Sequence, residues 1–215
     1  MAGQIDFFSH IGPTCPICGA SDCYRQTSPY WRYAIELVPE FKKKRIPIAR
    51  FVCRRRRRTF SLLPIQLIPY FQYTVSAVIG TLLMGFRSWQ MGQQGFYGAT
   101  ESVHPDSDMT PYLVFCWLSV VLRGLRRGHA TLKRFYDLSC VRSIQGTGPW
   151  EEVADYFLAF GWKPEVRWGP LLMTLLRRYS HVTTQFLFGT ASQQRNSIRH
   201  CAFPKGVFPA AIDTS

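Results

Sequence analysis

The sequence is poor in acidic residues. It has 13 aspartates and glutamates against 26 lysines and arginines, which gives a formal net charge of +13 and a pI near 9.8. This imbalance disfavours an acidic small molecule as the main ligand and favours a polyanion. Nucleic acid is the first candidate partner, and an anionic membrane surface is the second.

A secretory leader pattern is also missing. The first twenty residues have no basic start followed by an apolar run, because Asp6 and His10 interrupt them. Such a leader would imply export and disulfide formation. The sequence therefore predicts a cytoplasmic protein whose thiols are free to bind metal.

Long apolar runs are scarce. Residues 59 to 86 contain no charged side chain, but Pro64 and Pro69 divide this stretch and leave only Tyr70–Phe86. A membrane-spanning helix needs about 20 apolar residues. We therefore expect a buried helix over residues 73 to 86. A membrane-associated protein with Tyr70–Phe86 inserted is the alternative.

Signatures of catalysis are missing as well. The sequence has no nucleophile elbow and no phosphate-binding glycine loop, and a DDE-type transposase needs three carboxylates around two metal ions. The acids of the later half that lie outside polar turns and the tail are Asp137, Glu151, Glu152, Asp155 and Glu165. None follows a recognisable strand, and a helix start attracts carboxylates through its dipole alone. We predict that the protein is not an enzyme, with a degenerate or truncated transposase as the enzymatic alternative.

What is present indicates an α+β fold. Residues 30–37 and 45–52 are rich in β-branched and aromatic side chains with partial alternation, which predicts two strands. Pro47 is easiest to place on an edge strand. Helices are predicted over residues 73–86, 88–98, 110–127 and 150–160, with another from residue 170. Thr110 is the expected N-cap of the third helix and Gly128 its expected C-cap.

These elements suggest three parts. Residues 1–60 form a zinc-ribbon-like basic β unit, residues 61–188 form a mostly α-helical domain, and residues 189–215 form a basic, weakly ordered tail. Within the helical domain, residues 88–98 and 110–127 are a possible helix-turn-helix. Their connection is longer than such a turn usually is, so a simple packing face is the plainer interpretation.

The seven cysteines are odd in number and unsuited to a secreted disulfide scaffold. Cys15 and Cys18 have the Cys-x-x-Cys spacing of a zinc knuckle. Gly19 then accepts the positive φ at which such a knuckle ends. This segment predicts half of a tetrahedral zinc site.

The second half of the site is incomplete in the sequence. Cys53 begins it, but Arg56 stands where a second Cys-x-x-Cys would place its last sulfur. Cys23 is a possible third or fourth ligand, and His10 is a more distant one. The alternatives are that Cys23 is an ordinary buried residue and that the ribbon holds no metal. The predicted zinc ligands are Cys15, Cys18, Cys23 and Cys53.

A dense basic segment follows the cysteine knuckle. Ten of the 26 basic residues lie between residues 42 and 58, with no acid among them. They are Lys42, Lys43, Lys44, Arg45, Arg50, Arg54, Arg55, Arg56, Arg57 and Arg58. On adjacent ribbon strands we expect them to crowd one surface and to neutralise phosphates. A solvated loop or localisation-type patch is the plainer alternative.

Other side chains could extend this surface. Arg123, Arg126 and Arg127 at the end of the third predicted helix would contact phosphates without reading sequence. Tyr30, Trp31 and Tyr33 would stack on bases if they are exposed, although alternating aromatic residues more often face a core.

The N-terminal part resembles a known family. The segments Cys15-Pro-x-Cys-Gly19 and Cys53-Arg-x-x-x-Arg-Thr-Phe-Ser-Leu-Leu-Pro64 are similar to the zinc ribbon of bacterial transposase-like proteins from mobile elements. In that pattern a second Cys-x-x-Cys precedes the Arg-Thr-Phe-Ser segment and a helix-turn-helix follows. The resemblance covers roughly residues 15 to 125 and implies binding of duplex DNA together with mobile-element protein partners. The sequence thus predicts a non-catalytic DNA-binding protein with little or no sequence specificity.

Overall fold

A computed structural model describes residues 14–38, 40–141, 148–183, 185–188 and 200–201. His10 lies outside these residues. So does the tail predicted for residues 189–215, apart from the two residues of one short strand. The chain has an antiparallel sheet in its N-terminal part and helices after it, which confirms the α+β prediction.

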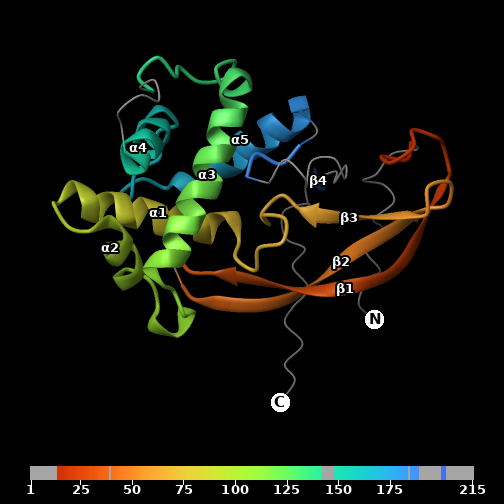
Figure 1. Cartoon of the computed structure of the whole chain (residues 1–215), viewed down its shortest axis with the longest axis horizontal. Helices are drawn as coiled ribbons and strands as arrows, with labels where there is room; N and C mark the ends of the chain where they lie inside the picture. The colour runs from red at the N-terminus through yellow and green to blue at the C-terminus, as the bar shows by residue number, and fades with distance from the viewer. Residues whose placement is uncertain (1–13, 39, 142–147, 184, 189–199, 202–215) are drawn as a thin grey trace.

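The sheet has the strand order β1-β2-β3-β4, and Figure 1 shows the helices gathered beside one end of its long hairpin. Its strands are β1 (Tyr24–Glu36), β2 (Lys42–Cys53), β3 (Arg58–Pro64) and β4 (His200–Cys201). The first three pair antiparallel, and β4 lies parallel to the end of β3. The two strands predicted from alternating side chains are confirmed as parts of β1 and β2.

Two prolines fit the hairpin at places where the ladder is incomplete. The β1–β2 register shifts between Thr27 and Tyr30, and Pro29 lies in this irregular stretch. Pro47 faces Trp31 on β1, outside the part of β2 that pairs with β3. Proline has no N–H to donate, so it is tolerated where a strand has one partner or none.

The helices are α1 (Val75–Gln90), α2 (Gly95–Glu101), α3 (Pro111–Leu132), α4 (Pro149–Ala159) and α5 (Trp168–Thr183), with a 3-10 turn η2 at Pro105–Ser107. The hydroxyl of Thr74 accepts a hydrogen bond from the Ala77 N–H and caps α1. Thr110 caps α3 in the same way, and Pro111 is its first residue, as predicted.

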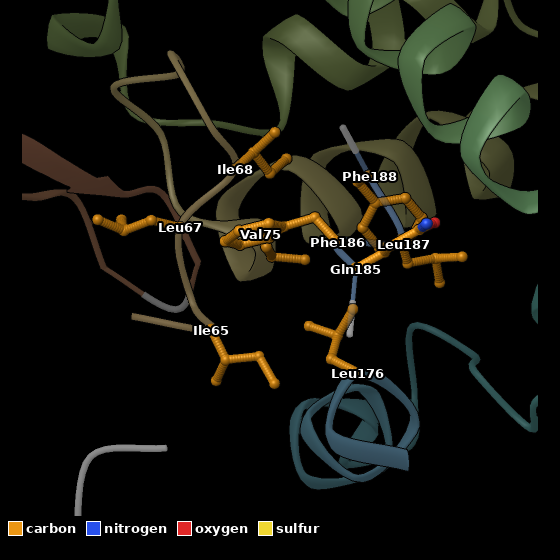
Figure 2. Close-up of a pocket in the computed structure, with 9 residues that line it drawn as sticks. All are labelled: Ile65, Leu67, Ile68, Val75, Leu176, Gln185, Phe186, Leu187 and Phe188. Atoms are coloured by element: carbon orange, nitrogen blue, oxygen red, sulfur yellow. The ribbon is translucent and has the colours of Figure 1, made fainter. Parts of the chain in front are cut away.

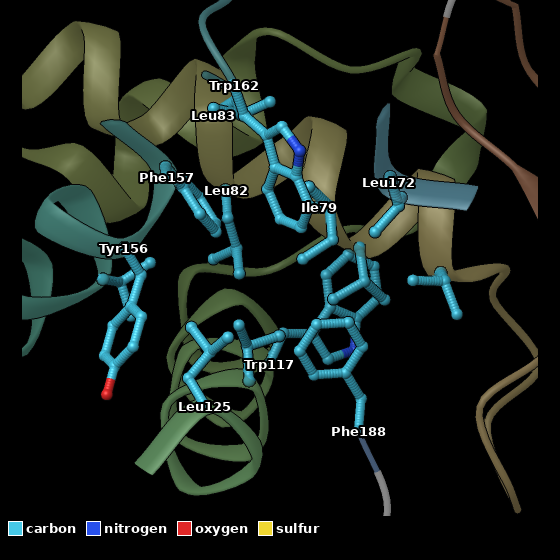
Figure 3. Close-up of a cluster of buried hydrophobic side chains, with 14 of the residues drawn as sticks. Ile79, Leu82, Leu83, Trp117, Leu125, Tyr156, Phe157, Trp162, Leu172 and Phe188 are labelled. Atoms are coloured by element: carbon cyan, nitrogen blue, oxygen red, sulfur yellow. The ribbon is translucent and has the colours of Figure 1, made fainter. Parts of the chain in front are cut away.

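The main core surrounds α1, whose side chains Ile79, Leu82 and Leu83 are almost completely buried. Figure 3 shows them beside Trp117 of α3 and Trp162, which follows α4. The predicted buried helix over residues 73–86 is therefore confirmed in substance. Within the described parts of the chain, no helix is both long and apolar enough to cross a membrane.

The predicted helix over residues 88–98 was wrong. Residues 88–98 form the end of α1, a turn and the start of α2, because Gly92 adopts a φ of +77° that no helix can continue through. The nine residues 102–110 then separate α2 from α3, a connection longer than the turn of a helix-turn-helix, which agrees with the plainer interpretation as a packing face.

Gly128 is not the C-cap of α3 but an interior residue, since α3 runs to Leu132. A Cβ at Gly128 would lie 2.7 Å from Leu187 Cδ1, so this glycine allows a close approach to the segment 185–188. Local cap chemistry is overridden here by packing between distant parts of the chain.

Two small cores lie on β2, on opposite faces of the sheet. One joins Phe51 and Phe60, whose stacked rings lie 5.3 Å apart, to the cysteines of the knuckle. The other joins Ile46 and Ile48 to the end of β3 and to Phe186. β3 also runs across the boundary predicted between residues 60 and 61.

Figure 2 shows an apolar cavity beside the second of these cores, between the start of α1 and the segment 185–188. Its lining includes Leu67, Val75, Leu176 and Phe186. The volume of about 10 Å³ is at the lower limit for holding even one water molecule. This cavity is a packing defect rather than a ligand site.

Candidate metal centre and nucleic-acid interface

The knuckle predicted at Cys15 and Cys18 is present. The Cys15 N–H donates to the Ala20 carbonyl at 2.9 Å, and the Gly19 N–H donates to the Cys15 carbonyl at 2.8 Å. Gly19 has a φ of +73°, which is why glycine suits this turn even though no atom would block a Cβ there. These bonds fold the segment back, and the Cys18 sulfur lies 3.0 Å from the sulfur of Cys23, the residue directly before β1.

The sheet supplies the other two sulfurs. Cys23 directly precedes β1, and Cys53 ends β2 opposite Tyr24 in the antiparallel register. A hydrogen bond of 2.8 Å from the Arg54 N–H to the Cys23 carbonyl closes this end of the hairpin. Strand pairing therefore brings together two cysteines that are 30 residues apart in the sequence.

The four sulfurs form one compact group. All lie within 4.8 Å of one another, and three of the separations are 3.0 Å for Cys18–Cys23, 3.6 Å for Cys18–Cys53 and 3.7 Å for Cys23–Cys53. Four sulfurs placed tetrahedrally at 2.3 Å from a zinc ion are about 3.8 Å apart, whereas a disulfide bond is about 2.05 Å long. Cys15, Cys18, Cys23 and Cys53 can therefore hold a metal ion together.

The contacts among the four cysteines shift the pKa values of two of their thiols. Hydrogen bonds, first from Cys23 and then from the backbone near Ala20, lower the pKa of Cys18 to about 7. The same contact with Cys18 raises the pKa of Cys23, followed by the effect of burial. Thiolates are the metal-binding form of cysteine, so one sulfur is close to its ligating state near neutral pH.

Arg56 takes part through its backbone. Its N–H donates to Cys53 Sγ at 3.4 Å, in the turn where the resembled pattern has a cysteine. Cys23 supplies the sulfur that Arg56 does not. The departure from the pattern therefore still leaves four cysteines in the group.

The turn after Cys53 and the first residue of β3 carry five exposed arginines, Arg54 to Arg58, which we call the arginine turn. Arg57 has a φ of +50°, which lets the chain reverse between β2 and β3. Within the described residues, no carboxylate forms an ion pair with any of the five. Their charges are thus open to a partner, directly beside the cysteine group.

The predicted single basic surface is wrong in one respect. Lys42, Lys43 and Lys44 lie at the start of β2 and the arginine turn follows its end, roughly 35 Å away for an extended strand. Lys42 also forms an ion pair of 2.7 Å with Glu40. Nine of the ten cations therefore form two separate groups, Lys42 to Arg45 and the arginine turn, and Arg50 lies between them on β2.

The aromatic residues of β1 are partly exposed rather than part of a core. Trp31 is 54% exposed, Tyr33 39% and Tyr30 38%. Lys43 lies 4.7 Å from the centre of the Tyr33 ring, and Arg45 lies 5.7 Å from that of Trp31. These cation–π contacts hold exposed rings beside positive charge.

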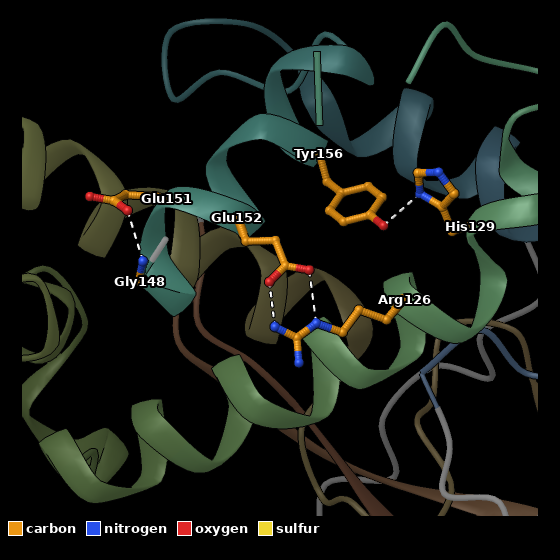
Figure 4. A network of polar contacts seen from close by, with 6 residues as sticks. All are labelled: Arg126, His129, Gly148, Glu151, Glu152 and Tyr156. Carbon is orange, nitrogen blue, oxygen red and sulfur yellow. Dashed lines mark hydrogen bonds and ion pairs between the residues drawn. The ribbon is translucent and has the colours of Figure 1, made fainter. Parts of the chain in front are cut away.

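The α3 arginines serve the fold. Arg126 makes a two-pronged ion pair with Glu152 of α4, whose side chain is only 2% exposed, as Figure 4 shows. Arg127 donates to the Leu187 carbonyl at 2.9 Å, and Arg123 donates to the Ser119 carbonyl at 3.1 Å. Arg126 and Arg127 therefore join α3 to its neighbours, while the Arg123 contact lies within α3; phosphate contacts of the three arginines stay a prediction.

Sequence reasoning missed Arg32 and Tyr70. Arg32 donates to the Ile68 carbonyl at 2.6 Å, and Tyr70 lies 76% exposed beside the sheet. A lone arginine within an aromatic strand was the available signal for the first. Tyr70 offered none, because its position depends on how the segment after β3 folds back.

Among the described residues, the four cysteines are the one group of three or more possible ligands close enough to share a metal ion. The arginine turn is the dense positive group next to them. Comparisons of the chain with protein-family models, curated proteins and solved structures found no match.

Proposed function

We propose that the protein binds duplex DNA, with little or no sequence specificity, through the arginine turn, and that one zinc ion on Cys15, Cys18, Cys23 and Cys53 holds this turn in place. Five exposed arginines directly beside four clustered sulfurs are the observation that carries the proposal. The association with mobile elements rests on the resemblance to transposase-like zinc ribbons.

Zinc fits the group best because of its donor set. Four thiolates arranged near a tetrahedron are typical of structural zinc sites. The Cys18–Cys53 and Cys23–Cys53 separations of 3.6 and 3.7 Å match that geometry, and the Cys18–Cys23 separation of 3.0 Å is shorter than it requires. A zinc ion with four thiolates carries a net charge of about −2, which neighbouring arginines stabilise. The cysteine core is also small, so a metal ion would add much of the stability of this end of the sheet.

Duplex DNA fits the arginine turn because of charge. Each phosphate that an arginine neutralises releases condensed counterions, so the salt dependence of binding reports the number of contacts. Arginine also forms two-pronged hydrogen bonds to phosphate. A turn in which all five side chains are exposed can reach the backbone of a duplex without entering a groove.

The contacts of two glutamates on α4 support a role without catalysis. Glu152 is engaged with Arg126, and Glu151 accepts a hydrogen bond of 2.7 Å from the Gly148 N–H at the start of α4. Both carboxylates thus have structural tasks on one helix.

The test is the affinity of the zinc-loaded chain for a short mixed-sequence duplex over a range of salt concentrations. Five lost phosphate contacts lower the slope of log K against log salt by up to about 4.5. We expect a large part of this change when all five arginines of the turn are replaced by glutamine.

The matched control removes five exposed cations from the helical part: Arg87, Lys163, Arg167, Arg177 and Arg178. It has the same net charge as the turn variant, so it separates contact from overall charge. Equal slopes for the two variants would contradict the proposal, and so would an unchanged slope for the turn variant with its zinc content retained.

A further inference from the structure

A groove lies on the face of the sheet opposite the cysteine core. Its volume is about 470 Å³, within the range of ligand sites. Side chains alternate between faces along a strand, so Arg50 of β2 and Ser61 of β3, which are register partners, share this face, while Phe51 and Phe60 point to the other.

Besides Phe60, Leu63 and Pro69, the lining combines two guanidinium groups, two phenol rings and two hydroxyl groups. These side chains are Tyr30, Arg32, Arg50, Thr59, Ser61 and Tyr70. No carboxylate is among the residues that line the groove. This composition suits a ligand with a negative charge and a flat ring.

The guanidinium groups have capacity for an anion. Arg32 donates one hydrogen bond, to the Ile68 carbonyl at 2.6 Å, and an arginine has five N–H donors. Arg50 makes a long contact of 3.4 Å to Thr59 Oγ1. In the described part of the chain, neither arginine forms an ion pair with a carboxylate. Burial lowers the pKa of Arg32, and a bound anion would offset this cost.

Tyr70 has an unusual position for a large aromatic residue. Its φ is +66°, a conformation that side chains rarely adopt, and it is 76% exposed at the rim of the groove. Neither burial nor backbone preference explains an aromatic residue here. A ring held outward at a groove with two arginines is suited to stacking on a base.

We propose that this groove binds unpaired nucleotides of a single nucleic-acid strand, with a base stacked on Tyr70 and the adjoining phosphate on Arg32 and Arg50. The inference rests on the proposed nucleic-acid function and adds a second site to it. A duplex keeps its bases stacked inside, so only an unpaired strand can present a base to this groove.

The test measures binding of fluorescent oligo(dT) and oligo(U) to the full zinc-loaded chain. Loss of one stacked base in Tyr70→Ala weakens single-strand binding by about 5- to 100-fold. Arg50→Gln lowers the salt slope for oligo(dT) by about 0.7, the value for one phosphate on a single strand. Duplex affinity should stay within twofold in Tyr70→Ala.

The controls are Tyr112→Ala and Arg87→Gln, both exposed positions on helices. The oligonucleotide that binds more tightly, oligo(dT) or oligo(U), identifies the preferred type of strand. Loss of binding to either one in Tyr70→Ala supports the proposal. Equal single-strand affinity in Tyr70→Ala and Tyr112→Ala would overturn it. The proposed function and this inference can fail separately. If the unaltered chain does not bind duplex DNA but binds oligonucleotides, and Tyr70→Ala loses the oligonucleotide binding, the proposed function is refuted and this inference stands.

Discussion

Three glycines in helices should respond differently to alanine, because their surroundings differ. A Cβ at Gly124 would lie 2.4 Å from the Leu187 carbonyl oxygen, a backbone atom that Arg127 also holds. At Gly128 the closest atom is the end of the Leu187 side chain, at 2.7 Å, and at Gly169 nothing lies within 4 Å. The flexible Leu187 side chain can therefore move away from a Cβ at Gly128, whereas the Leu187 backbone oxygen cannot move away from a Cβ at Gly124.

These contacts set the expected changes in the free energy of unfolding. Alanine is favoured over glycine in a helix interior by about 1 kcal/mol, and overpacking costs about 1–3 kcal/mol. Gly124→Ala should therefore destabilise by roughly 1–2 kcal/mol and Gly128→Ala should be near neutral. Gly169→Ala should stabilise by less than about 1 kcal/mol, because Gly169 is the second residue of α5 rather than an interior one. Urea denaturation followed by far-UV circular dichroism measures all three. A Gly124→Ala variant as stable as the unaltered chain would refute the close packing of α3 against residues 185–188.

Two further substitutions test the contacts at the metal centre and in the helical part. Arg56→Cys should leave the zinc content per chain unchanged, because Cys23 already completes the group of four cysteines. Competition with a chelator measures zinc retention, and a clear rise in the variant would show that Cys23 is not a ligand. Arg126→Met should destabilise the chain by about 2–4 kcal/mol, less than for a fully buried pair because the Arg126 side chain is 40% exposed. The double variant Arg126→Met/Glu152→Met should regain most of this loss in urea denaturation, and a double variant as unstable as the single one would argue against an uncompensated buried charge.

The predictable parts of the fold depend on local sequence. Alternating side chains marked the hairpin, the hydroxyl and proline at Thr110 and Pro111 marked the start of α3, and the Cys-x-x-Cys-Gly knuckle was recognisable from five residues. In each case the interactions that determine the local structure join residues only a few positions apart. The chain therefore forms these local structures largely as the sequence predicts.

The remaining features depend on packing between distant segments. Cys23 joins the site because the β1–β2 register places it beside Cys53, which the sequence spacing alone does not reveal. The extended β2 strand likewise separates two basic groups that are close in sequence. Glu152 and Arg126 meet only because α4 packs on α3, so a carboxylate at a helix start proved to be an ion-pair partner.

One metal ion that joins the four cysteines is central to the proposed function. X-ray absorption at the zinc edge of the purified chain, combined with elemental analysis, tests this directly. We expect one zinc per chain with four sulfur neighbours at about 2.3 Å. A first shell that contains nitrogen or oxygen, or a chain that carries no metal and joins Cys18 to Cys23 in a disulfide, would contradict it.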